Sequence, residues 1–588
     1  FALMMKGRAD DRRLFERGMK LNVTSLQDST GVNVDALAQA LKPGTRIELA
    51  PSDYLLPEII SQPLLSVESK AHGAGIDVAD IRELVVLFEH ATTFGSLIQV
   101  PEGLAEKLPA LKQLSEATSQ HLFVSEALKR LGPLVRQAEL LAAQYDAVVA
   151  NPPYMGRKGM NVEVKDFVRS RFPTAKSDLF ACFIERGYTL ATDLAWCAMV
   201  TMQSWMFLSS FQDLRRMMLQ EKTIASLVQI GLNSFPSMNS KIAQATVFSL
   251  MNRLVPNYVG SFLDLNSAPA AANKHELFLA RDPANRFEVP VNRFEKIPGS
   301  PISYKLSSGL VNCFATSTAS IKDLAVSEGK NVTTDNTRFV RYWWEVSSAD
   351  VGRPSRRWLP FAKGGPFRKW FGNEFEVVDW SLVARHHYQS APAGRLIREE
   401  YWYLRGVTWS KITSLQPSFR LLEAEQTYQE VAVLFTTEQE EQLLPLLGLL
   451  NSTVAEKILE VLSPTLSHQL DDINRIPWSE LQKANEITQC VAALVEAARS
   501  DSNAFEVAPA FELIRLRALG QREGRISKNW LKMTGDSRVR TVRMLELETK
   551  NNRLFIDAYG LAGELTPDVA IEQITLTVNP AYRYGGKL

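Results

Sequence analysis

The sequence has 588 residues, of which 45% are hydrophobic and 22% are charged, and its formal net charge is +1. A chain of this length exceeds the roughly 250–300 residues that one hydrophobic core supports, so we expect about two to four domains. The near-zero net charge excludes a uniformly basic surface for nucleic acid, although a local basic cleft is compatible with it.

The first 150 residues are predicted to be mostly helical, with one strand near the start and one at the end. Residues 1–20 have helical spacing, and Leu21–Asp28 alternate like a strand that ends in an acid. Residues 79–145 are rich in Leu, Ala, Glu and Lys with helical spacing, and prolines divide them into several helices. Tyr145–Ala150 form a short apolar run, which is typical of a parallel strand buried on both faces. The two prolines that follow must end this strand.

Helices and strands alternate in the next hundred residues. Helices are predicted at 177–187 and 211–221, and strands at 194–200, 223–230 and 245–250. This alternation indicates an α/β fold with a doubly wound parallel sheet. Such sheets bind their ligands beyond the carboxyl ends of the strands, which is where Asn151–Tyr154 lie. After about residue 255 prolines and aromatics become more frequent, and helical spacing returns over 440–500.

Asn151–Tyr154 read Asn-Pro-Pro-Tyr, and their groups suit chemistry on an amino nitrogen. The N6 nitrogen of adenine is a poor nucleophile because its lone pair is delocalised into the ring, so an enzyme needs acceptors for both N6 protons. Asn151 offers a side-chain carbonyl, and Pro152 offers a main-chain carbonyl at a rigid corner. Tyr154 offers a face for base stacking, worth about 1–3 kcal/mol. A plain turn is the simpler interpretation of four residues, but their place after a strand favours catalysis.

This motif resembles the catalytic motif of the amino-methyltransferases that modify adenine N6 with S-adenosylmethionine. The resemblance implies four catalytic residues: Asn151, Pro152, Pro153 and Tyr154. It also implies that the target base leaves the duplex, at a cost of roughly a few kcal/mol. Asn233–Leu250 resemble the segment in which this family places a second aromatic on the flipped base, which implies Phe235 as the stacking residue. Core packing is the alternative role for Phe235.

Segments along nearly the whole chain resemble the large adenine-specific DNA methyltransferases of BREX bacteriophage-defence systems. They are Arg338–Glu345, Trp358–Gly365, Gly406–Ser410, Pro417–Arg420 and Asn551–Gly560. The family marks host DNA at a short non-palindromic site and acts with other BREX proteins. The resemblance implies a class I methyltransferase core in a partial catalytic domain at 1–255. A mixed α/β target-recognition domain at 256–480 and a helical C-terminal region at 481–588 would follow.

One part of the family's pattern is not in this chain. The glycine-rich cofactor loop, and the acid that holds the cofactor ribose, would lie just before Phe1 in the family order. We therefore expect a core that is incomplete at its N-terminus, with further residues upstream. Asp28 is a candidate contact to the adenine edge of S-adenosylmethionine, and a helix cap or turn acid is the alternative.

Residues 338–385 interleave basic and aromatic side chains. They hold nine Arg and Lys against five Asp and Glu, and five of the eleven tryptophans. Such a mixture suits phosphate contacts combined with base or sugar packing. For a single tryptophan a core position is the better explanation, and the charges could form a solvated face. The candidate DNA-binding residues are Arg356, Arg357, Lys363, Arg368 and Lys369.

The cysteines and the apolar runs exclude several other classes of site. The four cysteines are widely spaced without a CxxC pair, so neither a disulfide framework nor a zinc site is predicted. His386 and His387 are adjacent, and adjacent histidines rarely converge on a metal. No run approaches the ~18–20 apolar residues of a membrane span, and there is no signal peptide. We therefore expect a bacterial cytoplasmic protein without a metal or a membrane.

Three other functions stay open. Enzymes that methylate a glutamine amide in proteins also carry Asn-Pro-Pro-Tyr, although they are small and lack an extension like residues 255–588. A non-catalytic DNA-binding specificity subunit would explain the missing cofactor loop. A fused nuclease would need a Pro-Asp…Glu-x-Lys constellation, and we find none that convinces. Double-stranded DNA is the expected partner, and a DNA-mimicking phage inhibitor could occupy the same basic cleft.

Overall fold

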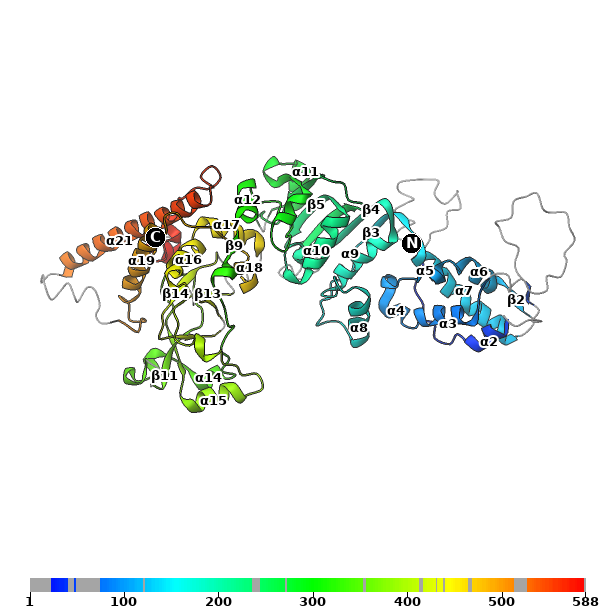
Figure 1. Ribbon diagram of the computed structural model, residues 1–588, viewed down its shortest axis with the longest axis horizontal. Helices are drawn as coiled ribbons and strands as arrows, with labels where there is room; N and C mark the ends of the chain where they lie inside the picture. The colour runs from blue at the N-terminus through cyan, green and yellow to red at the C-terminus, as the bar shows by residue number, and fades with distance from the viewer. Residues whose placement is uncertain are drawn as a thin grey trace. The chain divides into compact units, whose positions relative to one another are not determined.

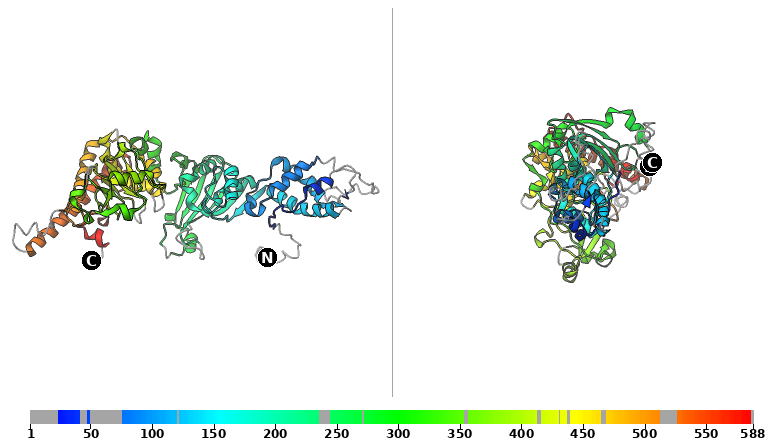
Figure 2. Two further views of the ribbon diagram at one scale, coloured as in Figure 1. Left: turned by 90° about the horizontal axis from the view of Figure 1, so that it is seen from below. Right: turned by 90° about the vertical axis from the view of Figure 1, so that its right-hand side faces the viewer.

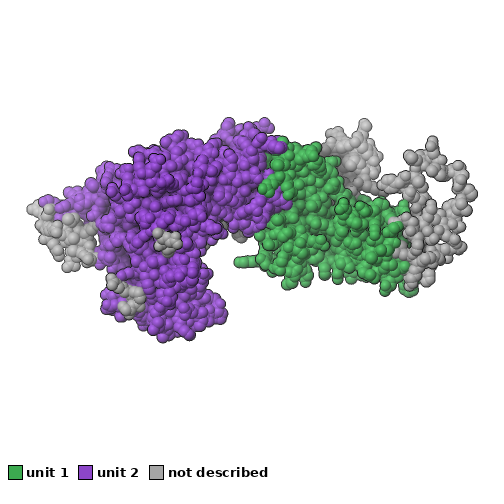
Figure 3. Space-filling view, in the orientation of Figure 1, with its two compact units in different colours: residues 1–203, 220–255, 263–280 green, residues 204–219, 256–262, 281–588 purple. Residues whose placement is uncertain are grey.

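The computed structural model describes residues 23–40, 47–48, 75–119, 122–234, 244–269, 272–352, 356–411, 416–429, 431–436, 439–463, 468–511 and 526–585. The chain divides into two compact units (Figure 3). Unit 1 contains residues 1–203, 220–255 and 263–280, and unit 2 contains residues 204–219, 256–262 and 281–588. Each unit is thus built from separate stretches of the chain. The predicted helix at 1–20 lies outside the described residues.

Unit 1 begins with helices, as residues 79–145 predict. They are α2 (Val34–Ala40), α3 (Val78–Leu87), α4 (Ala91–Phe94), α5 (Glu102–Ala105), α6 (Leu108–Glu116) and α7 (Leu122–Ala142). Their apolar faces share one core, in which Leu84, Leu111 and Leu131 are fully buried. The strand predicted at 21–28 is wrong, because residues 23–29 form no regular strand. They pair instead with helix α7 through Gln27, whose N–H donates to the Gln137 side chain at 3.0 Å.

A six-stranded sheet with the order β3-β4-β6-β5-β7-β8 follows along the chain, and its strands β3, β4, β5 and β6 lie wholly in unit 1. Strands β3, β4 and β5 are labelled in Figure 1. The strands are β3 (Tyr145–Ala150), β4 (Ala191–Met202), β5 (Thr223–Gly231), β6 (Ala245–Met251), β7 (Val259–Asp264) and β8 (Arg286–Pro290). Strand β3 runs parallel to β4, and β6 runs antiparallel to both β4 and β5. Strands β3, β4 and β5 therefore point their carboxyl ends to the same edge. This confirms the α/β fold, but the sheet is mixed because β6 inserts antiparallel between two strands.

Helix α9 (Leu179–Leu190) connects β3 to β4 and covers them. It follows α8 (Val162–Arg171). A Cβ on Gly187 would lie 2.6 Å from the Met199 methyl group, so any larger residue here would require the Met199 side chain to move. Arg186, which is 4% exposed, donates to the main-chain carbonyls of Ser96, Ile98 and Leu141. This buried side chain joins helix α9 to the N-terminal helices, and burial lowers the pKa of Arg186 to about 10.

Strand β3 differs from its prediction in burial. The sequence predicts a strand buried on both faces, but the side chain of Val149 is 79% exposed and that of Trp196 on β4 is 43% exposed. Among the described residues, β3 has one strand neighbour, β4, and so it forms an edge of the sheet. Edge strands leave one row of main-chain groups without a ladder partner.

Unit 2 contains one short strand pair, β9 (Ala319–Ser320) with β17 (Pro477–Trp478), and two larger sheets. One of the larger sheets has the order β10-β12-β11-β15 and the other has the order β14-β13-β16. The strands are β10 (Val340–Tyr342), β11 (Trp358–Ala362), β12 (Glu376–Asp379), β13 (Gly406–Ser410), β14 (Phe419–Leu422), β15 (Thr427–Tyr428) and β16 (Val431–Leu434). Strands β10 and β11 both run antiparallel to β12, so their carboxyl ends share an edge.

Helices complete unit 2. They include α15 (Leu382–Ser390), α16 (Leu443–Leu450), α17 (Thr453–Leu462), α19 (Ala484–Ser502) and α21 (Ile526–Ala558), and Figure 2 shows α21 as one continuous helix. Helix α10 (Gln212–Glu221) and α12 (Ser308–Thr316) also lie mainly or wholly in this unit. One core contains Leu446, Val491 and Phe555, so residues on both sides of 480 pack together. Within the described ranges, no helix combines the length and the apolar character that crossing a membrane requires.

Candidate active site and DNA interface

Asn151–Tyr154 lie directly after β3, at the edge where β3, β4 and β5 end. Asn151 is exposed, Pro152 is buried and Tyr154 is half-buried. The two prolines end the strand as predicted. The motif therefore presents a carboxamide and an aromatic ring at the carboxyl edge of a sheet, where α/β proteins bind their ligands.

The Tyr154 hydroxyl lies close to two acceptors. It is 3.4 Å from Asn151 Oδ1 and 3.3 Å from the Val200 carbonyl oxygen on β4. Burial raises the pKa of Tyr154, so the hydroxyl stays protonated and donates. Bonds of this length are weak, and an incoming amino group can replace the one to Asn151. The Phe180 ring meets the Tyr154 ring edge-on, with centroids 6.4 Å apart.

Asp178 fixes the chain that leaves the motif. Its Oδ1 accepts the N–H of Met155 at 3.0 Å and the N–H of Phe180 at 3.3 Å, so it caps helix α9 and holds the motif at once. The Leu179 N–H returns a bond to the Met155 carbonyl at 3.1 Å. Burial raises the pKa of Asp178. Sequence reasoning did not select this residue, although an aspartate just before an apolar helical run is a recognisable N-cap.

Asp28, the predicted contact to the cofactor, bonds to Thr92 in the structure. Its two carboxylate oxygens accept the main-chain N–H and the hydroxyl of Thr92, at 2.8 and 2.7 Å. These bonds lower the pKa of Asp28. Thr92 lies in the first turn of α4, so Asp28 satisfies a helix N-terminus from a distant segment. The helix-cap alternative therefore accounts for both oxygens. Phe235, the predicted base-stacking residue, lies outside the described residues.

Three of the five predicted DNA-binding residues keep accessible charge, and they lie at opposite ends of β11. Arg356 and Arg357 are exposed and come just before the strand, whereas the half-buried Lys363 follows it. Arg357 pairs with Asp379 at 3.0 Å and lies over the Trp358 ring. At about 3.3 Å per residue, the positions of Arg357 and Lys363 are roughly 20 Å apart along the strand. They cannot contact one phosphate together.

Arg368 and Lys369 are engaged inside unit 2. Lys369 is 8% exposed, and its ammonium pairs with the Glu548 carboxylate at 3.1 Å. Arg368 donates to the Thr577 hydroxyl at 2.6 Å. The prediction that Lys369 contacts phosphate is wrong, because a buried cation that neutralises a buried carboxylate has no free charge for DNA.

The tryptophans of this region divide between core and surface. Trp358, Trp370 and Trp380 are at most 8% exposed. The Trp370 indole N–H donates to Glu548 at 2.9 Å. Trp344 is 49% exposed and stacks on Tyr342 with ring centroids 4.7 Å apart. The core interpretation thus holds for the three buried tryptophans and not for Trp344.

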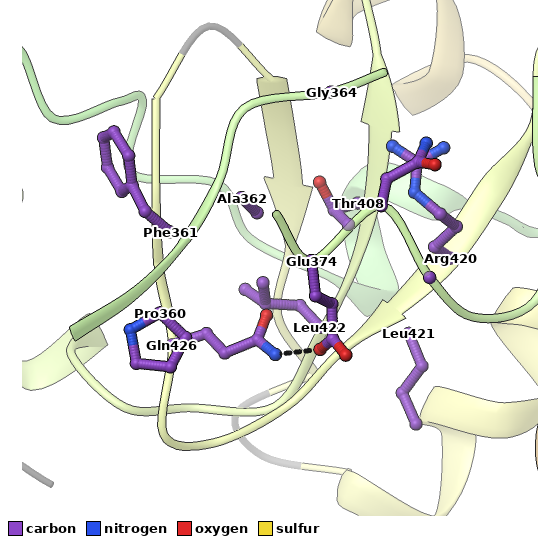
Figure 4. A pocket seen from close by; sticks show the side chains of 12 residues that line it. Pro360, Phe361, Ala362, Gly364, Glu374, Thr408, Arg420, Leu421, Leu422 and Gln426 are labelled. Atoms are coloured by element: carbon purple, nitrogen blue, oxygen red, sulfur yellow. Dashed lines mark hydrogen bonds between the residues drawn. The ribbon is translucent and has the colours of Figure 1, made fainter. Parts of the chain in front are cut away.

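A small pocket lies between the two sheets of unit 2 (Figure 4). Gln426 donates to the Glu374 carboxyl group, and burial raises the pKa of Glu374. The Arg420 guanidinium, on the other side of the pocket, is 2% exposed, and burial lowers its pKa to about 10. Arg420 donates to the Arg368 carbonyl at 3.3 Å. Gln426 and Glu374 thus bond to each other, whereas Arg420 bonds to the main chain of Arg368.

Comparison with known proteins adds independent findings. Residues 98–235 match the Eco57I restriction-modification methylase family. The chain is 30% identical to the adenine-specific methyltransferase BrxX of Escherichia coli O9:H4 (strain HS), over 100% of this chain and 47% of that protein. It is 28% identical to the adenine-specific methyltransferase PglX of Lacticaseibacillus casei (strain Zhang), over 97% of this chain and 47% of that protein.

The chain therefore spans about half the length of the curated relatives it matches. Among solved structures, the type IIL restriction-modification enzyme MmeI in complex with DNA matches with a TM-score of 0.48 and 11% identity. That match covers 83% of this chain and 68% of MmeI.

Proposed function

The chain is a homologue, along its whole length, of the adenine-specific methyltransferases BrxX and PglX, and from this premise we propose that it methylates adenine in DNA at N6. The observation that carries the proposal is the position of Asn151–Tyr154. The motif follows β3 at the carboxyl edge of the sheet, and Asp178 holds it against α9. The match of residues 98–235 to a methylase family includes all of these residues.

The chain's own groups account for the substrate side of the reaction. Asn151 Oδ1 and the Pro152 carbonyl accept the two N6 protons, which turns the nitrogen lone pair out of the ring plane. The Tyr154 ring stacks on the base, and Phe180 supports that ring from its edge. Holding the nitrogen in line with the methyl group is worth several orders of magnitude in rate. The adenine would leave the duplex to reach this edge.

We propose S-adenosylmethionine as the methyl donor, because it supplies an electrophilic methyl group. Asp28 is our candidate contact to its adenine edge, and its carboxylate also accepts two bonds from Thr92. We assign Asn151–Tyr154 to the base.

We also propose which partners the protein binds and in which biological process it acts. We propose that unit 2 positions double-stranded DNA, with Arg356, Arg357 and Lys363 on phosphates. By the resemblance to BREX methyltransferases, the protein would act with other BREX proteins in defence against phage. A DNA-mimicking inhibitor would compete for the same basic residues.

The test is to express the full-length gene with its genomic neighbours and to map N6-methyladenine in host DNA by single-molecule sequencing. We expect one non-palindromic methylated motif, which disappears with Asn151→Ala and persists with Asn312→Ala, an exposed asparagine on α12. If the wild type methylates no DNA while its neighbours are present, the proposal fails in favour of a non-catalytic DNA-binding subunit. If Asn151→Ala still methylates DNA, the assigned site is wrong.

A further inference from the structure

Three glutamines form a chain of hydrogen bonds at the edge of the sheet that carries Asn151–Tyr154. Gln203 Nε2 donates to Gln244 Oε1 at 2.6 Å, and Gln229 Nε2 donates to Gln203 Oε1 at 2.9 Å. The main-chain N–H of Gln203 also donates to the Gln244 carbonyl at 2.8 Å. Gln203 is 2% exposed and Gln229 is 5% exposed, so two of the three amides lie in the interior.

Each glutamine stands where a strand begins or ends. Gln203 follows the last residue of β4, Gln229 lies near the end of β5, and Gln244 immediately precedes β6. Met202 and Gly231 both pair with Ala245, the first residue of β6. The amides therefore cross the sheet at its carboxyl edge. This is the edge at which Tyr154 approaches Val200, a residue of the same strand end that Gln203 closes.

The arrangement fixes the orientation of the central amide. The Gln203 amide N–H2 donates to Gln244, and its carbonyl accepts from Gln229. If this amide were flipped, its N–H2 would face the N–H2 of Gln229 and its carbonyl would face the carbonyl of Gln244. Burying polar groups costs more than burying apolar groups of the same size, and a fully bonded polar chain specifies one geometry. An apolar side chain would fill this position at lower cost and without that specificity.

Hydrogen bonds also fix both ends of the connection between β5 and β6. At one end the Ser234 hydroxyl donates to the Gly231 carbonyl, and Lys274 donates to the carbonyls of Ile230 and Leu232. At the other end, two bonds from Gln203 hold Gln244. Gln203 thus links the end of β4, beside the motif, to the start of β6.

We propose that Gln203 is a positioning residue for methyl transfer, because its carboxamide locks the ends of β4 and β5 and the start of β6 into one geometry beside Asn151–Tyr154. This inference rests on the proposed function. Gln203 touches neither the base nor the donor in this assignment, and it acts through Gln244 and Gln229. Its loss should reduce turnover per folded molecule more than DNA affinity.

The experiment compares three variants of the full-length protein. Gln203→Met removes both bonds, Gln203→Glu keeps the size and the acceptor but loses the donor to Gln244, and Gln220→Met changes an exposed glutamine of α10 as a control. The substrate is a duplex that contains the site found by sequencing. Single-turnover methylation gives the rate, titration gives the DNA affinity, and 2-aminopurine at the target position reports extrusion of the base.

For Gln203→Met we expect a methylation rate lower by about a hundredfold, the effect of a displacement near 1 Å, with DNA affinity unchanged within about threefold. The 2-aminopurine signal should fall as well. Gln203→Glu should recover part of the rate as pH falls from 8.5 to 6, since only the protonated carboxyl group can donate to Gln244. If Gln203 had only a structural role, the variants would have a lower folded fraction. Their rate per folded molecule, and its dependence on pH, would equal those of the wild type.

The outcomes separate this inference from the proposed function. If the wild type does not methylate DNA, the proposed function fails and the inference with it. If the wild type is active and Gln203→Met keeps its rate within about twofold, only the inference is overturned. If Gln203→Met does not fold, Gln203→Glu decides, because a rate equal to that of the wild type at all pH values would equally overturn it.

Discussion

Asp178 accepts the main-chain N–H of Met155 at 3.0 Å, and this bond ties the residue after Tyr154 to the start of helix α9. The same carboxylate oxygen caps α9 through the N–H of Phe180. One side chain thus serves both the stability of a helix and the geometry of the motif. The two roles can be separated by experiment.

We expect Asp178→Ala to lower the free energy of unfolding by about 1 kcal/mol, the usual cost of removing an N-cap. It should also reduce methylation turnover strongly, because the motif loop loses its anchor. Asn161→Ala is the matched control, since Asn161 caps α8 through the N–H of Val164 at 2.9 Å and does not bond to the motif. Urea denaturation and turnover are measured for both variants. Equal losses of turnover would contradict the anchoring role.

The Lys369–Glu548 pair predicts a difference between buried and exposed cations. Lys369→Met should destabilise unit 2 by about 3 kcal/mol, because it leaves the buried Glu548 carboxylate without its cation. Arg357→Met should cost less than about 1 kcal/mol, because the Arg357 side chain is 62% exposed in its pair with Asp379. Denaturant midpoints of the two variants test this. A Lys369→Met variant as stable as Arg357→Met would show that the buried pair contributes little.

The salt dependence of DNA binding tests the predicted phosphate-binding residues. Changing Arg356, Arg357 or Lys363 singly to glutamine should weaken binding, and it should lower the slope of log affinity against log salt by roughly 0.9 for each phosphate that the protein no longer neutralises. Lys457→Gln removes an exposed charge of α17 that pairs with Glu460, and it should leave the slope unchanged. Fluorescence anisotropy at several salt concentrations gives the slopes. A slope that none of the three substitutions changes would place the DNA elsewhere.

Glu374 gives a prediction about pH. Burial raises the pKa of its carboxyl group above the ordinary 4.5. The folded state therefore binds this proton more tightly than the unfolded state, and the resulting stability is present below pH 4.5 and is lost as pH rises through the folded pKa. Glu374→Gln cannot lose a proton. The stability of the wild type relative to this variant should fall as pH rises above about 4.5, as thermal or urea unfolding would measure.

Local patterns predicted the elements near the motif but not their neighbours. Tyr145–Ala150 form a strand with the predicted bounds, because two prolines end it. Its exposure depends on which strands lie beside it, and hydrophobicity alone does not specify that. Lys369 was predicted as a free charge because its partner, Glu548, lies 179 residues away in sequence. Asp28 likewise bonds to Thr92, 64 residues away, and the strand predicted before it did not form.

The motif of the candidate site could be predicted from the sequence, but the residues that support it could not. Asn151–Tyr154 are recognisable because the chemistry needs those residue types in consecutive positions. The residues that hold them are not consecutive: Asp178 reaches the motif through a helix cap, and Gln203, Gln229 and Gln244 meet only when three strands pair. Their roles follow from the fold and leave little trace in local sequence.

The edge position of β3 has a practical consequence for handling the protein. Val149 is 79% exposed on a strand whose outer row of main-chain groups has no ladder partner among the described residues. Such an edge can recruit a strand from another molecule. The described residues on their own are therefore expected to self-associate through β3 at high concentration, and Val149→Lys should reduce this association in light scattering.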